Sequence, residues 1–300
     1  MRRFGFEQFN TFDKPLWTKL KAAARAAIIG GFQGTSDLEA AKRYGIRAIG
    51  TAAHAFTLLH DDERAAFDSQ VANLGPGTTL LVDTYDVAQG VVNAVEAARA
   101  AGGELGAVRL DSGDLVAQAF KVRGQLDAMG ATSTRITVTS DLDEYAIAAL
   151  GAAPVDSYGV GTRLVTGSGV PTAALVYKVV AREDSGGGMV PVAKKSESKS
   201  TVGGMKVAGR VIGEEGYAAE ELLLVGVPLD EAADALQARG ARPLQIPLVV
   251  DGGIDPRMWG SEALARAQER HIRSRNELPY QAWRLSEGET AIPTRYEKAG

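Results

Sequence analysis

The stretch Ala107-Val108-Arg109-Leu110-Asp111-Ser112-Gly113-Asp114 decides the fold that the sequence predicts. Its first four residues are typical of a buried β-strand, although one of them is an arginine. An amphipathic run, 115–129, follows the turn directly and predicts a helix. In α/β folds the carboxyl ends of the strands carry the chemistry. The stretch therefore places a cation and carboxylates at such an end. The structural alternative is that Arg109 and Asp111 only form an ion pair with each other there.

Neighbouring segments repeat this order of strand, polar turn and helix. We expect further strands at 47–50, 79–82, 136–139 and 156–160. Asp86 is expected to cap the helix after the second of these strands, and 144–150 forms a short helix after the third. Successive units of this kind predict a parallel sheet with right-handed crossovers. No Gly-x-Gly-x-x-Gly follows the first strand, so the pattern favours a barrel or partial barrel over a dinucleotide-binding sheet.

The remaining segments extend this core on both sides. Before it we expect helices at 20–29 and 38–43, the second capped by Asp37 and ended by Gly45. The sequence thus predicts an atypical segment over 1–21, a βα core over 22–170, and a third part over 171–300. Within that third part we expect strands at 173–181, 190–193 and 243–249, helices at 229–239 and 261–275, and a basic stretch at 194–206.

Composition excludes several classes of function. The 300 residues contain no cysteine, which excludes disulfides, thiolate metal sites and cysteine nucleophiles. A net charge of −4 provides no basic field for nucleic acid or for an anionic membrane. The first residues lack the apolar core of a signal peptide, and no apolar run is long enough to span a membrane. We therefore expect a cytoplasmic protein that binds small molecules.

Polar residues follow each predicted strand, so they should converge at one edge of the sheet. His54 follows the strand expected at 47–50, and Asp83 follows the strand at 79–82. Arg109 lies in the strand at 107–110, and Asp111 directly follows it. A neutral imidazole with a pKa near 6.5 is suited to act as nucleophile or base. The structural alternative for His54 is a half-buried ring bonded to a backbone carbonyl. His60 and His271 are interpreted as structural.

The last two strands end in groups that suit a phosphate. Gly161 and Thr162 combine free backbone N–H groups with a hydroxyl, which is typical of an anion site. Ser140 and Asp141 on the adjacent loop offer a second set of donors. A phosphate site beside several carboxylates suggests a ligand with a phosphate and sugar hydroxyls, and carboxylates can stabilise an oxocarbenium-like centre.

Four motifs together resemble the nicotinate phosphoribosyltransferase family. They are Gly50–Ala55, Val82–Asp86, Val108–Asp114 and Tyr158–Thr162, and the Lys/Ser/Thr-rich stretch 194–206 is similar to a segment that follows the barrel strands in that family. The resemblance runs from about Ala22 to the C-terminus. It implies an irregular α/β barrel of the type II phosphoribosyltransferase kind, completed by a smaller domain.

The resemblance also implies a reaction and roles for residues. Nicotinate would be joined to phosphoribosyl pyrophosphate, giving nicotinate mononucleotide for NAD salvage, with ATP hydrolysis coupled through a phosphohistidine. By the resemblance, His54 occupies the phosphohistidine position, Thr51 and Arg109 match contacts to nicotinate, and Thr162 matches a contact to phosphate. Together with the strand-end positions described above, we expect His54, Asp83 and Asp111 to be catalytic. The expected substrate-binding residues are Thr51, Arg109, Asp114, Ser140, Asp141, Gly161 and Thr162. ATP and Mg²⁺ would serve as co-substrate and counter-ion. No resident metal or tightly bound cofactor is expected. A homodimer is also expected.

The sequence departs from the family before Ala22. Family members carry an N-terminal domain ahead of the matched region, including an aromatic side chain that stacks on the pyridine ring, and Phe4–Lys19 does not fit that pattern. The alternative hypothesis is accordingly a non-catalytic fragment or paralogue that binds phosphoribosylated ligands or a partner subunit. Quinolinate phosphoribosyltransferase is a weaker alternative, because it needs a more basic pocket for two carboxylates.

Overall fold

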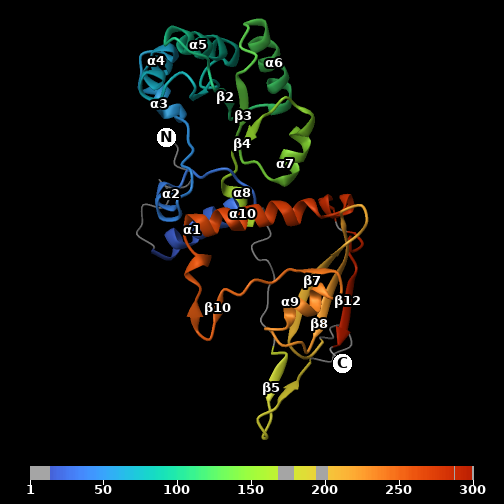
Figure 1. Ribbon diagram of the computed structural model, residues 1–300. Coiled ribbons are helices and arrows are strands. Elements are labelled where there is room, and N and C mark those ends of the chain that lie inside the picture. Colours follow the sequence, from blue (N-terminus) through green and yellow to red (C-terminus); the bar gives the residue numbers. More distant parts are fainter. Residues whose placement is uncertain (1–13, 168–178, 194–201, 287, 299–300) are drawn as a thin grey trace. The chain divides into compact units, whose positions relative to one another are not determined.

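The computed structural model describes residues 14–167, 179–193, 202–286 and 288–298 (Figure 1). Contacts within the chain divide it into two compact units. The first unit comprises residues 1–28 and 32–173, and the second comprises residues 29–31 and 174–300. Among the described residues, no helix is both long and apolar enough to cross a membrane.

Four helices precede the sheet of the first unit: α1 (Lys14–Ile29), α2 (Leu38–Tyr44), α3 (His54–Leu58) and α4 (Glu63–Leu74). The helix expected at 20–29 is confirmed but begins earlier, at Lys14. Pro15 lies in its first turn, where a missing backbone N–H costs no hydrogen bond. The caps of α2 are also confirmed, since Asp37 accepts from two backbone N–H groups and Gly45 adopts a left-handed φ of 65°.

The sheet of the first unit consists of β1 (Thr79–Leu81), β2 (Ala107–Leu110), β3 (Arg135–Val138) and β4 (Ser157–Tyr158), all parallel and in sequential order. The connections and the segment after β4 contain α5 (Val87–Ala100), α6 (Leu115–Ala128), α7 (Glu144–Ala149) with a 3-10 turn at Leu150–Ala152, and α8 (Thr162–Thr166). Asp86 caps α5 as expected. The successive βα units are confirmed, and the described strands form an open, partial barrel.

One expectation for this unit is wrong. Residues 47–50 form no strand, because they make only an isolated bridge between Thr35 and Ala48 and find no neighbour in the sheet. After the last strand, the short helix α8 begins at Thr162.

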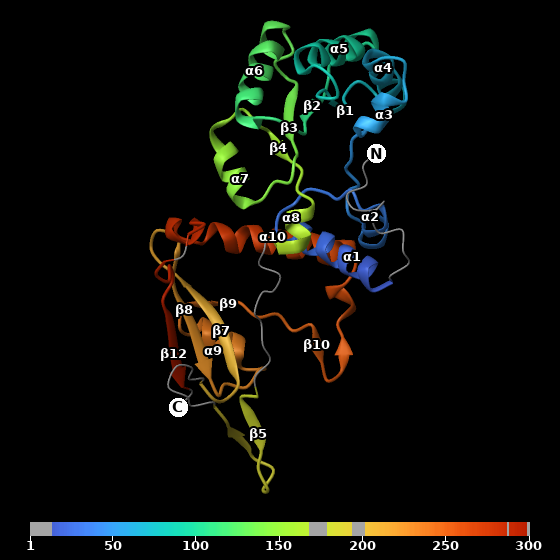
Figure 2. The same cartoon turned by 180° about the vertical axis from the view of Figure 1, so that it is seen from behind.

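Alternation along the strands separates an apolar face from a polar one. Val108 and Leu110 of β2 are fully buried in a core with side chains of α4, α5 and α6, as are their neighbours on β1 and β3. Figures 1 and 2 show these helices beside the sheet. Because side chains alternate between faces with a period of two, Arg109 and its pairing partner Thr137 lie on the opposite face.

The second unit contains a sheet in the order β12-β8-β7-β9 (Figure 2). Its strands are β7 (Lys206–Ile212), β8 (Ala218–Val225), β9 (Ala241–Pro243) and β12 (Thr294–Lys298), with α9 (Ala232–Gln237) packed on it through Leu236. The unit also contains the hairpins β5 (Ala181–Glu183)–β6 (Met189–Pro191) and β10 (Val249–Val250)–β11 (Gly253–Ile254), helix α10 (Ser261–Asn276), and 3-10 turns at Pro256–Met258 and Tyr280–Trp283.

The strands expected at 173–181 and 190–193 are present in part, as β5 and β6 of an antiparallel hairpin, and the helix at 261–275 is confirmed. Residues 173–178 and 194–201 lie outside the described residues. Of the helix expected at 229–239, only the part in α9 (Ala232–Gln237) forms. The strand expected at 243–249 is wrong, because pairing stops at Pro243 and resumes at Val249. Pro243 and Pro247 lack the N–H donor that a continuous ladder needs.

Gly90 on α5 provides a test of the helix–sheet contact. A Cβ built there would lie 2.3 Å from the carbonyl oxygen of Val82, which is backbone and cannot move cheaply. We expect Gly90→Ala to lower the free energy of unfolding by about 1–3 kcal/mol, measured by urea titration. The matched control is Gly124→Ala on α6, where no atom lies within 4 Å. The Gly124→Ala change should stabilise the protein by about 0.5–1 kcal/mol. Equal effects of Gly90→Ala and Gly124→Ala on the free energy of unfolding would contradict the close contact between Gly90 and Val82.

Candidate active site

His54 lies between two carboxylates at the carboxyl edge of the sheet. It is the first residue of α3, while Asp83 follows β1 and Asp111 follows β2. Its Nε2 atom is 3.7 Å from Asp111 Oδ2 and 3.9 Å from Asp83 Oδ1. Its Nδ1 atom is 3.1 Å from the hydroxyl of Thr84. The structural alternative for His54 predicted a bond to a backbone carbonyl, but the ring bonds to a side-chain hydroxyl instead. His60 does make such a bond, to Phe56 O at 2.8 Å.

The Asp83 carboxylate connects the ends of β1 and β2. Its Oδ2 atom accepts from the Asp111 backbone N–H at 2.9 Å and from the Ser112 hydroxyl at 2.8 Å. Only 2% of the side chain is exposed, and the buried Oδ1 atom has no hydrogen-bond partner among the described residues. A buried carboxylate oxygen without a donor is costly. Asp83 therefore directs an unused acceptor toward His54.

Arg109 joins three separate segments of the chain through its guanidinium. Nη1 donates to the Thr51 hydroxyl at 2.7 Å, Nη2 to Asp111 Oδ1 at 2.9 Å, and Nε to the Thr139 hydroxyl at 2.9 Å. The ion pair with Asp111 that the sequence allowed is thus present. A guanidinium has five N–H groups, so these three bonds leave two for a ligand.

The pKa of Asp111 lies below its usual value. Burial acts to raise it, but the hydrogen bond from Thr139 and the adjacent Arg109 guanidinium outweigh burial, with a smaller contribution from His54. Asp111 is therefore ionised throughout the neutral range. An ionised carboxylate next to a cation is suited to accept from hydroxyls and to face a developing positive charge.

The other expected site residues lie at neighbouring strand ends. In the described part of the chain they make no hydrogen bond to the side chains of His54, Asp83, Arg109 or Asp111. Ser140 and Asp141 follow β3 and have positive φ values of 117° and 44°. Such angles are strained for residues with a Cβ and concentrate at functional loops. Gly161 and Thr162 begin α8. Asp114 Oδ1 accepts from Ala117 N at 3.0 Å and so caps α6, which leaves only its second oxygen for a ligand.

Sequence reasoning missed Thr84 and Thr139, two hydroxyls that contact His54, Arg109 and Asp111. Thr84 directly follows Asp83 and Thr139 directly precedes Ser140, two residues already selected at strand ends, so position was the available signal. Threonine is common in strands, and this residue type alone gives no reason to select either one.

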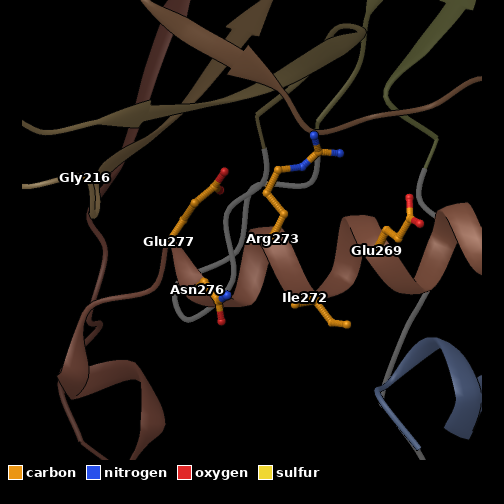
Figure 3. A pocket seen from close by; sticks show the side chains of 6 residues that line it. All are labelled: Gly216, Glu269, Ile272, Arg273, Asn276 and Glu277. Atoms are coloured by element: carbon orange, nitrogen blue, oxygen red, sulfur yellow. The ribbon is translucent and has the colours of Figure 1, made fainter. Parts of the chain in front are cut away.

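A surface groove of about 530 Å³ lies elsewhere, in the second unit. Figure 3 shows Glu269, Ile272, Arg273, Asn276 and Glu277 of α10 around it, together with Gly216. It contains none of the residues expected from the sequence. No group of three or more His, Cys, Asp or Glu side chains in the described ranges is arranged to hold a metal ion.

Comparison with known proteins relates the chain to one enzyme class. No protein-family model matches it. Over 282 residues it is 51% identical to nicotinate phosphoribosyltransferase pncB1 of Mycobacterium tuberculosis, covering 91% of this chain and 59% of that protein. It is 39% identical over 224 residues to a nicotinate phosphoribosyltransferase of Bacillus subtilis, covering 72% and 44%. The chain thus spans about three fifths, or less, of the length of these relatives.

Solved structures show a similar fold. Human nicotinic acid phosphoribosyltransferase has a TM-score of 0.62 and 21% identity, covering 92% of this chain and 64% of the other. A nicotinate-nucleotide pyrophosphorylase from Pyrococcus furiosus has a TM-score of 0.63 and 22% identity, covering 91% and 65%. The expected α/β fold of the type II phosphoribosyltransferase kind is therefore confirmed.

Glu63, the first residue of α4, is a buried carboxyl in the same unit. It is 6% exposed, accepts from Asn93 Nδ2 at 3.0 Å through Oε2, and leaves Oε1 without a partner among the described residues. Burial raises its pKa above the usual value. The Asn93 bond opposes this shift, and the like charges of Asp86 and Asp83 add to it. The folded protein therefore binds the Glu63 proton more tightly than the unfolded chain does.

This raised pKa predicts a pH-dependent stability. A carboxyl with a raised native pKa destabilises the fold as the pH rises from its unfolded value, about 4.5, through its native value. Glu63→Gln removes that titration, so the variant's melting temperature should rise relative to wild type between pH 4 and pH 7. The exposed Glu96→Gln is the control and should show a much smaller change in this difference. A constant difference for Glu63→Gln across this range would contradict the assignment.

Proposed function

Because the chain belongs to the nicotinate phosphoribosyltransferase family, we propose that it forms nicotinate mononucleotide from nicotinate and phosphoribosyl pyrophosphate. This reaction serves NAD salvage and is coupled to ATP hydrolysis through a phosphohistidine at His54. One observation supports the proposal above others: His54 Nε2 lies within 4 Å of two carboxylates, and Arg109 is bonded to one of them.

The hydrogen bonds of His54 indicate which nitrogen reacts. Nδ1 is paired with the Thr84 hydroxyl, so Nε2 is the nitrogen left for attack on the γ-phosphorus of ATP. An N–P bond forms at Nε2 while the bond from the γ-phosphorus to the ADP oxygen breaks. Asp83 and Asp111 are both acidic and lie on this side of the ring. The incoming phosphates thus need a cation, and Mg²⁺ enters with ATP as counter-ion, with carboxylate oxygens of the kind it prefers nearby.

Arg109, Asp111 and Thr51 would form the contacts to the base and the ribose. The two free N–H groups of Arg109 suit the carboxylate of nicotinate. A planar guanidinium can also stack on the pyridine ring. Asp111 and Asp83 face the anomeric carbon as it gains positive charge when pyrophosphate leaves. Ser140, Asp141, Gly161 and Thr162 bind phosphate in this proposal, and the second oxygen of Asp114 is left for a ribose or pyrophosphate–metal contact.

Two further expectations remain proposals: a homodimer, which rests on the resemblance, and a cytoplasmic location, which rests on the composition. The alternative function, ligand binding without catalysis, would use Arg109 and the phosphate-binding loops but gives no role to the placement of His54 between carboxylates.

A labelling experiment tests the phosphohistidine. Incubation with ATP labelled at the γ-phosphate should transfer an acid-labile, base-stable label to the protein. His54→Asn should abolish the label and the ATP-coupled turnover. His60→Asn should retain both, because among the described residues the His60 ring bonds only to Phe56 O, within its own turn. Wild-type protein that makes no nicotinate mononucleotide and takes up no label would overturn the proposal.

Arg109→Lys tests the base contact. Lysine keeps the charge but loses the planar fork, and a charged hydrogen bond contributes about 1.5–3 kcal/mol. We expect affinity for nicotinate to fall roughly tenfold to hundredfold more than affinity for nicotinamide. Calorimetric titration of both ligands measures this, with melting curves to monitor the fold. If Arg109 only neutralises Asp111, the variant will lose stability and keep the wild-type preference.

A further inference from the structure

Thr139 lies directly after β3 and contacts two functional side chains through one hydroxyl. The residue is 5% exposed. Its Oγ1 atom accepts from Arg109 Nε at 2.9 Å and donates to Asp111 Oδ1. The Leu110 carbonyl is a more distant acceptor, at 3.4 Å. Thr139 was not among the residues that the sequence selected, and the function proposed above gives it no role.

The single proton of this hydroxyl fixes the direction of the chain of bonds. Because Oγ1 accepts from Arg109 Nε, its own proton is free to be donated to Asp111 Oδ1. That oxygen also accepts from Arg109 Nη2 at 2.9 Å, so it has two donors. The other carboxylate oxygen, Oδ2, then faces His54 Nε2 at 3.7 Å. Thr139 thus determines both the plane of the guanidinium and the rotation of the carboxylate.

Packing against Gly159 constrains the Thr139 side chain itself. A Cβ built on Gly159 would lie 2.5 Å from Thr139 Cγ2, so the methyl group occupies space that only a glycine leaves open. A β-branched side chain in a strand has few allowed χ1 angles. With the methyl group against Gly159, the hydroxyl is directed at Arg109 and Asp111.

We propose that Thr139 is a positioning residue that sets the preference for a carboxylate-bearing pyridine by orienting Arg109 and Asp111. The inference rests on the proposed function. The bond from Nε to Thr139, together with those from Nη1 to Thr51 and from Nη2 to Asp111, holds the guanidinium, and its two unused N–H groups are available to a planar carboxylate. Without the Thr139 hydroxyl, Nε loses its acceptor and Asp111 Oδ1 loses one of its two donors, so both groups are held by fewer bonds.

The test compares Thr139→Val, which removes the hydroxyl at nearly constant shape, with Thr139→Ser, which keeps it. Calorimetry should show that Thr139→Val weakens nicotinate binding by roughly tenfold relative to nicotinamide, the effect of losing a hydrogen bond to a charged group. Thr139→Ser should retain most of the preference. The matched control is Thr134→Val, since Thr134 is 1% exposed and its hydroxyl donates to Leu105 O at 3.0 Å. That control should lower the melting temperature and leave the preference unchanged.

A second readout follows Arg109 directly and needs no turnover. In proton–nitrogen spectra, the Arg109 Nε–H signal should exchange slowly with water in wild type and in Thr139→Ser. It should be lost by exchange in Thr139→Val and in Gly159→Ala, where the new methyl group displaces Thr139. An unchanged ligand preference or a retained Nε–H signal in a folded Thr139→Val would overturn the inference. Wild-type protein that binds nicotinate without turnover would contradict the proposed function only, because the binding ratio still tests Thr139.

Discussion

The site depends on the burial of one cation, Arg109. Its side chain is 11% exposed, on a strand whose neighbouring residues are fully apolar. Moving a charge out of water is unfavourable unless hydrogen bonds and an opposite charge replace the solvent. Thr51, Asp111 and Thr139 supply these bonds from three separate segments of the chain. Satisfying the arginine therefore requires the ends of β2 and β3 and the approach to α3 to adopt one arrangement.

The same requirement places His54. Thr51 lies three residues before it, and the Asp111 backbone N–H binds Asp83, whose free oxygen faces the imidazole. A parallel sheet with helices on one face makes this possible, because alternation directs Val108 and Leu110 to the helices and Arg109 to the other face. The apolar core thus fixes the register that brings the polar side chains together.

The sequence was sufficient to predict the strand ends but not the bonds between them. The stretch 107–114 and the helix after it were predicted because an apolar strand pattern and an amphipathic run are both local signals. The segment 47–50 also looked like a strand, but pairing depends on neighbours that no local pattern specifies. Likewise, the contact of Thr139 with Arg109 depends on register between β2 and β3, so only the folded chain shows it.

Two carboxyls in this unit, the partly buried Asp111 and the buried Glu63, show how environment separates residues of similar chemistry. Asp111 receives bonds from Thr139 and Arg109, and its pKa falls although burial acts to raise it. Glu63 receives one bond from Asn93, and the charges of Asp86 and Asp83 add to the effect of burial, so its pKa rises. A lowered pKa keeps Asp111 in the charged form that can face positive charge, whereas a raised pKa disfavours that form of Glu63. A count of acidic residues near the sheet edge would have treated both alike. The donor groups around each carboxyl, not its position in the sequence, determine which one can take part in the chemistry.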